Sequence, residues 1–240
     1  MFGWLRRVLF PAPPTEQQLK MEQALADYPP YTPPPFRPEL DLVTPGAADA
    51  EYADYFFGTM PARREALRAF LLHFDVELSA DDAGLAAISA WLPQWGELLA
   101  YDYKDKEAQN AFHRLGAPWT GRLLALNVIF DLGVYYAECL WTRRTNLKWE
   151  VMRFPDICIH SVLRLPGGKG FAPMDFVYSE CDSIRRDKED IRKRRPGSEY
   201  SHVLKPDSFS RHVLAKTPRN RRWRKQPWSG SWTEDQDDDA

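Results

Sequence analysis

Apolar residues recur at helical spacing in the first half of the chain. Leu67, Phe70, Leu71 and Phe74 stand at i, i+3, i+4 and i+7, which places them on one face of a helix. Pro61 suits the first turn of that helix, because a proline there removes no intrahelical hydrogen bond. The pattern therefore predicts an amphipathic helix that begins at about Pro61.

A second helix is expected directly afterwards. Ser79 with Asp82 has the form of a helix cap, and Pro93 interrupts the helix near its end. The residues that share its apolar face are Leu85, Ile88 and Leu92. Because the connection between the two helices is short, they are expected to form an antiparallel hairpin.

The most apolar long segment runs from Pro118 to Thr142. Its Leu, Val, Ile, Phe and Tyr side chains lie on most sides, which indicates a central helix covered by neighbours all round. After it the period changes to two, because Leu147, Trp149 and Val151 alternate with charged residues. Residues 157–165 are expected to add a second strand, and Trp149 is expected to face the core.

Pro173 is expected to open a last helix that turns apolar side chains inward. Together the elements predict an α+β protein that is mainly helical. In it a helical hairpin and a central apolar helix pack with a small antiparallel sheet and a closing helix.

Three regions are expected along the chain. Residues 1–48 hold a short helix, capped by Thr15 and Gln18, and a proline-rich strap. Residues 49–195 form the globular α+β domain. Residues 196–240 form a tail that is first basic and then acidic.

Composition limits the class of protein further. Hydrophobic residues make up 44% of the chain and aromatic residues 13%, which excludes disorder throughout. Three scattered cysteines, Cys139, Cys158 and Cys181, suit a reducing compartment, so a cytoplasmic location is expected. No secretory signal is expected, because Pro11 follows too soon after Arg7, and no stretch is expected to span a membrane.

Polar residues interrupt the central apolar helix at helical spacing. Asn127, Asp131 and Tyr135 lie four apart and Glu138 follows three further on, so all four share one face. Carboxylates in an apolar helix are costly unless they are paired or hydrated. The cluster therefore indicates either a structural network, with arginines such as Arg122 or Arg143 as partners, or a paired-carboxylate acid/base site. The structural interpretation is favoured.

Other candidate chemistry is sparse. Cys158 and His160 would share one face of a strand, where Cys181 could complete a zinc site or the Cys–His pair could act as a nucleophile. Two half-buried strand residues explain the pair more simply, and the spacing of common metal, phosphate and hydrolase motifs is missing. Neither a cofactor nor a metal is expected.

The basic C-terminal region is the candidate nucleic-acid contact. It places cations beside a stackable ring at Arg221, Arg222, Trp223, Arg224 and Lys225. By residue count Ser183–Lys225 carries about +10, whereas the last residues are acidic. A solvated tail whose tryptophans fold back on the domain is the favoured interpretation.

One stretch of the chain matches a longer pattern. The matching residues are Leu132, Gly133, Tyr135, Glu138, Leu140, Trp149, Val151 and Pro173, with Ala137 where a glycine is usual. With them the segment between Asn127 and Glu180 resembles uncharacterised bacterial domains in which a helix, a Trp-bearing strand, a second strand and a Pro-started helix follow one another. Some of these resemble immunity proteins of toxin systems. The resemblance implies a stoichiometric toxin inhibitor without catalysis.

Three functions from different classes remain open. The first is a partner-binding or immunity-type protein with a protein partner, which is favoured because no catalytic motif stands out. The second is a nucleic-acid-associated protein that uses the basic region. The third is a hydrolase centred on Asp131 and Glu138.

Overall fold

The fold is described from a computed structural model, which covers residues 13–30, 38–102, 104–114, 118–143, 148–154, 158–164 and 170–194. Its α-helices are α2 (Glu16–Ala26), α3 (Ala47–Leu72), α4 (Asp82–Trp95), α5 (Lys106–Arg114), α6 (Ala125–Arg143) and α7 (Pro173–Arg194). Short 3-10 helices are η1 (Pro38–Leu42), η2 (Gly96–Leu98) and η3 (Gly121–Leu123). The strands are β1 (Lys148–Phe154), β2 (Cys158–Arg164) and β3 (Gly170–Phe171).

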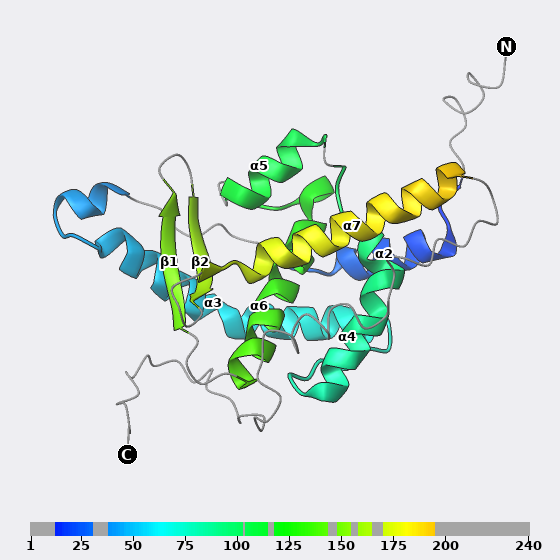
Figure 1. Cartoon of the computed structure of the whole chain (residues 1–240), viewed down its shortest axis with the longest axis horizontal. Helices are drawn as coiled ribbons and strands as arrows, with labels where there is room; N and C mark the ends of the chain where they lie inside the picture. The colour runs from blue at the N-terminus through cyan, green and yellow to red at the C-terminus, as the bar shows by residue number, and fades with distance from the viewer. Residues whose placement is uncertain are drawn as a thin grey trace, which may run out of the picture.

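The molecule is a helical protein, and the predicted α+β class with a small antiparallel sheet packed among the helices is wrong. The apolar faces of α3, α4, α6 and α7 bury one another and form the described core. Figure 1 shows these helices filling the body of the molecule, with β1 and β2 beside the first half of α3. Period-two alternation in residues 147–165 indicated extended backbone, but it could not show that helices alone would complete the core.

Helix α6 is the centre of the core, as its apolar composition predicted. Its side chains from Ala125 to Leu140 are all buried. Helix α7 crosses it (Figure 1), and the two backbones approach closely at Gly133. A Cβ atom on Gly133 would lie 2.5 Å from the Cα atom of Met174. Gly133 is therefore the residue that permits this close crossing.

Helix α3 begins at Ala47, so the predicted start at Pro61 is wrong. Pro61 lies inside the helix, where it cannot donate the usual hydrogen bond to the carbonyl of Phe57. The apolar stripe extends through Tyr52 and Phe56 into the first half of the helix, and both side chains are buried. That stripe outweighs the local cost of the proline.

Helix α4 is capped by Asp81 and not by the predicted Ser79 and Asp82 pair. The Asp81 carboxylate accepts a hydrogen bond of 2.9 Å from the backbone N–H of Gly84, and the Ser79 hydroxyl donates to the same carboxylate. Pro93 lies within the helix, which continues to Trp95. The predicted closing helix is confirmed as α7, and it begins at Pro173.

Helix α2 belongs to the described core. Thr15 and Gln18 form the predicted capping box at its start. Met21, Ala24 and Tyr28 are buried, and the ring of Tyr28 meets Phe70 edge-on at 5.5 Å. This segment is thus one of the helices that cover α3.

The strands β1 and β2 pair antiparallel, with Trp149 opposite Leu163, and β3 adds two residues beside β2. Trp149 is buried, as predicted, and its ring lies 5.3 Å from that of Phe56 on α3. The contact joins the strand pair to the helical core.

Candidate functional site

The four polar residues that the sequence places on one face of α6 are all buried, and each is engaged inside the molecule. Asn127 is fully buried, and Asp131, Tyr135 and Glu138 are each 2% exposed. Their helical spacing keeps them on one side of α6, which faces α2, α3 and the connection before α4. The predicted cluster is therefore a set of interhelical contacts.

Asp131 receives a hydrogen bond on each carboxylate oxygen. The hydroxyl of Tyr28 donates to Oδ2 at 2.5 Å, and Nε of Arg63 donates to Oδ1 at 2.9 Å. Burial raises the pKa of Asp131 to about 6, although Arg63 and Tyr28 oppose the rise. This carboxylate joins the end of α2 to both α3 and α6.

Asn127 completes the same network. Its side-chain amide donates to the backbone carbonyls of Trp119 and Leu124, each at 2.8 Å. Its oxygen accepts a hydrogen bond of 3.3 Å from Nη2 of Arg63. One guanidinium therefore holds both polar residues of the first two turns of α6.

Tyr135 and Glu138 form two further contacts. The hydroxyl of Tyr135 donates to the backbone carbonyl of Ser79 at 2.8 Å, and burial raises the pKa of this phenol. Nη1 of Arg64 lies 3.0 Å from Oε1 of Glu138, whose side chain is 2% exposed. These two contacts fix α6 to the start of α4 and to α3.

A cavity of about 190 Å³ lies between α3 and α6, beside this network. Met60, Leu67 and Val134 supply apolar wall, while Arg64, Asp131 and Glu138 supply charge. The side chain of Arg64 is 29% exposed, so it connects the cavity with the surface. Such a concave, mostly apolar space with a few polar groups is the usual form of a small-ligand site.

Arginines are the partners that the sequence predicted, but from other positions. Arg63 and Arg64 bind the carboxylates of α6, whereas Arg122 pairs with Asp105 and Glu107. The side chain of Arg143 lies outside the described residues. Arg63 could have been found from sequence, because it occupies the apolar stripe of α3 between Met60 and Leu67.

The thiols form no described site. Cys139 and Cys181 are buried thiols, and burial raises the pKa of the Cys181 thiol. The side chains of Cys158 and His160 lie outside the described residues. In the part of the chain that is described, no group of three His, Cys, Asp or Glu side chains could hold a metal ion.

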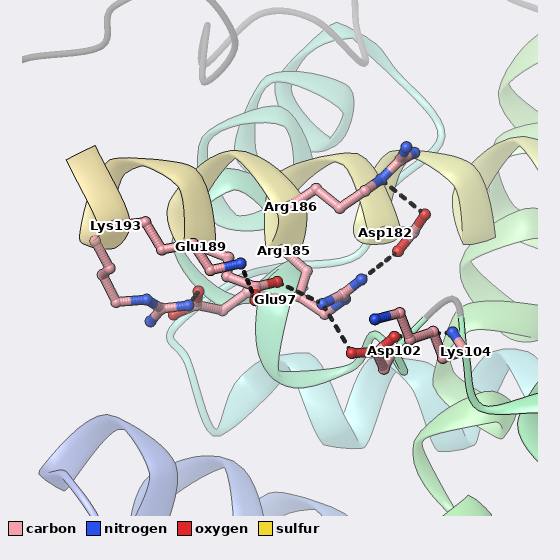
Figure 2. Close-up of polar contacts among 9 residues, drawn as sticks. Glu97, Asp102, Lys104, Asp182, Arg185, Arg186, Glu189 and Lys193 are labelled. Atoms are coloured by element: carbon pink, nitrogen blue, oxygen red, sulfur yellow. Dashed lines mark hydrogen bonds and ion pairs between the residues drawn. The ribbon is translucent and has the colours of Figure 1, made fainter.

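The candidate nucleic-acid contacts Arg221, Arg222, Trp223, Arg224 and Lys225 also lie outside the described residues. Of the basic region Ser183–Lys225, the structure describes the part that lies on α7. There its cations pair with carboxylates of the chain (Figure 2). Arg185 bonds to Asp182 and Glu189, and Lys193 also bonds to Glu189. Lys188 and Arg192 reach Glu97 of η2. The two pairs with Glu97 fix α7 to η2.

The segment Gly121–Thr142 is long and apolar enough to cross a membrane by length and composition. However, 94% of its most apolar window is buried inside the structure, as in the core helix of a soluble protein. Comparison with protein families, curated proteins and solved structures finds no match for this chain.

Proposed function

We propose that this chain is a non-catalytic protein that binds a protein partner and neutralises a bacterial toxin in the manner of an immunity protein. One observation carries the proposal. Both carboxylates of α6, the best candidates for acid/base catalysis, are engaged by Arg63, Arg64 and Tyr28. The resemblance of residues 127–180 to immunity-type domains supplies the kind of partner.

The hydrogen bonds to Asp131 argue against a hydrolase that uses this carboxylate as its general base. A general base needs a lone pair that faces the proton it will remove. Both oxygens of Asp131 instead accept hydrogen bonds from the chain itself, at 2.5 Å and 2.9 Å. These two bonds and the 2% exposure of Asp131 leave little access for a substrate proton to the carboxylate.

Charge favours a basic partner. The net charge of −2 combines about +10 in Ser183–Lys225 with about −12 in the remainder of the chain. Asp75, Glu77 and Asp81 in the connection between α3 and α4 are all exposed, as is Asp82 at the first position of α4. Opposite charges speed the encounter of two proteins and disfavour wrong partners.

The nucleic-acid alternative receives less support from the described residues. Arg185, Lys188 and Lys193 already form ion pairs within the molecule, so they present little unbalanced charge to phosphate. We therefore retain the protein partner as the proposal.

The test begins with a pull-down from the native host, with the partner identified by mass spectrometry and produced in pure form. Calorimetry then compares the parent with Glu138→Gln and with the double variant Asp75→Lys, Glu77→Lys. We expect Glu138→Gln to keep its affinity within about tenfold, or ~1.4 kcal/mol. The double reversal should weaken binding by more than about tenfold, because it replaces attraction with repulsion.

Asp54→Lys is the control for the reversal. Asp54 is exposed on α3, roughly 27 Å before Leu72, the last residue of that helix, at ~1.5 Å per residue. Its reversal should leave the affinity unchanged. Turnover of a substrate that disappears in folded Glu138→Gln would overturn the binding proposal and favour a hydrolase.

A further inference from the structure

The cavity between α3 and α6 has room for a small organic molecule. Its volume is about 190 Å³, and an apolar protein cavity of about 150 Å³ is enough to hold benzene. Met60, Leu67 and Val134 line it with apolar side chains. A ligand that fits must therefore be compact and mostly apolar.

The carboxylates around the cavity already have cationic partners. Asp131 is bonded to Arg63, and Glu65 at the surface is paired with Arg68. Glu138 is paired with Arg64. A cationic ligand would have to displace an arginine from one of these pairs before it could bind a carboxylate.

Arg64 has hydrogen-bonding capacity left over. Its ion pair with Glu138 uses Nη1. Its Nε atom is buried, and no described residue accepts a hydrogen bond from it. The Nε edge of a guanidinium offers two parallel N–H groups, which match the two oxygens of a carboxylate. An anionic group at this position would satisfy a buried donor that has no acceptor among the described residues.

We propose that the cavity between α3 and α6 binds a small organic carboxylate with a compact apolar body, of about the size of benzoate. The carboxylate pairs with the Nε edge of Arg64, and the apolar body lies against Met60, Leu67 and Val134. The 29% exposure of the Arg64 side chain gives the ligand an approach from solvent. This binding is independent of the proposed protein partner.

The probe for the test is sodium benzoate, titrated into the full chain and followed by NMR and calorimetry. We expect saturable binding that shifts signals of residues on α3 and α6. Benzyl alcohol and benzylamine keep the ring but replace the carboxylate by a neutral or a cationic group. Both should bind at least roughly tenfold more weakly than benzoate, because neither supplies the paired acceptors.

Two substitutions test the role of Arg64. Arg64→Gln removes the charge, and Arg64→Lys keeps a charge beside Glu138 but lacks the planar fork. Each should weaken benzoate binding by roughly tenfold or more. Arg64→Lys keeps the test valid if Arg64→Gln does not fold, which thermal unfolding will show.

Arg68→Lys is the matched control, because Arg68 lies one turn further along α3 and pairs with Glu65 at the surface. It should bind benzoate as the parent does. Benzoate binding that is absent, that survives unchanged in folded Arg64→Lys, or that is weaker than benzylamine binding would overturn the proposal.

Discussion

Asp131 illustrates how burial and charge oppose each other at a single side chain. Burial disfavours the ionised carboxylate, whereas Arg63 and the hydroxyl of Tyr28 favour it. Burial is the larger effect, so the pKa is raised from 3.8 to about 6. The network of Asp131 with Arg63 and Tyr28 therefore connects the helices but costs some stability, as is common for buried ion pairs.

The raised pKa predicts a pH dependence that can be tested with Asp131→Asn. A carboxyl whose pKa is higher in the folded than in the unfolded state stabilises the fold fully below the unfolded value, and this contribution is lost as pH rises through the folded value. The parent should therefore gain stability relative to Asp131→Asn as the pH falls from 7 to below 4. The expected gain is about 3 kcal/mol, for a rise of about two pKa units.

The measurement is urea unfolding of both proteins across that pH range. The difference between their free energies of unfolding removes the contributions of other carboxyl groups, such as Glu180, which titrate in both proteins. If the parent instead gains stability relative to Asp131→Asn as the pH rises, the interactions with Arg63 and Tyr28 outweigh burial. The pKa of Asp131 then lies below its ordinary value.

The sequence showed which residues of α6 would be polar and buried, but not what they would contact. Their spacing of three and four residues was visible within one helix. Tyr28 and Arg63, however, lie 103 and 68 residues away from Asp131 along the chain. Only the tertiary packing of α2 and α3 on α6 brings these groups together.

At the scale of elements, the clearest predictions came from helices with strong local signals. Helix α6 was apparent from its continuous apolar composition, and α7 from Pro173 followed by an apolar stripe. The start of α3 was missed because a proline such as Pro61 is typical of the first turn of a helix. The apolar spacing, however, continues on both sides of it, and Pro61 lies inside the helix. Helix α5 was not predicted: its nine residues include only Phe112 as a large apolar core residue.

The close crossing of α6 and α7 leads to a prediction for Gly133. In Gly133→Ala the new Cβ atom would lie 2.5 Å from Cα and 2.8 Å from N of Met174, both of them backbone atoms. Helix α7 must therefore move, and we expect a loss of about 1–3 kcal/mol in the free energy of unfolding. Chemical denaturation with circular dichroism measures the loss.

Gly58→Ala is the control, because Gly58 also lies inside a helix but a Cβ atom there would meet nothing within 4 Å. Alanine at this exposed site should raise stability by about 0.5–1 kcal/mol through its better helix propensity. Equal stability of the two variants would show that α6 and α7 do not approach as closely as described.

At the scale of the whole molecule, the sequence predicted the mainly helical content but not which elements cover the core. Alternating residues around Trp149 led to the α+β class, whereas the core is formed by helices and receives Trp149 at its edge. Periodicity reports which face of an element is buried, not which element covers it. The cavity likewise arises only where α3 and α6 meet.

Two truncations test where the folded unit ends. The described core cluster extends from Met21 to Ile184. The stretch after Lys216 lacks a periodic apolar pattern and carries blocks of like charge, which favour solvent over packing, so its removal should leave the urea midpoint and the slope of unfolding unchanged. Removing residues 1–30 takes away buried Met21 and Tyr28 and should cost on the order of 4 kcal/mol, at about 2 kcal/mol for each large side chain. A tail truncation that lowers both midpoint and slope would instead place Trp223 and its neighbours within the cooperative unit.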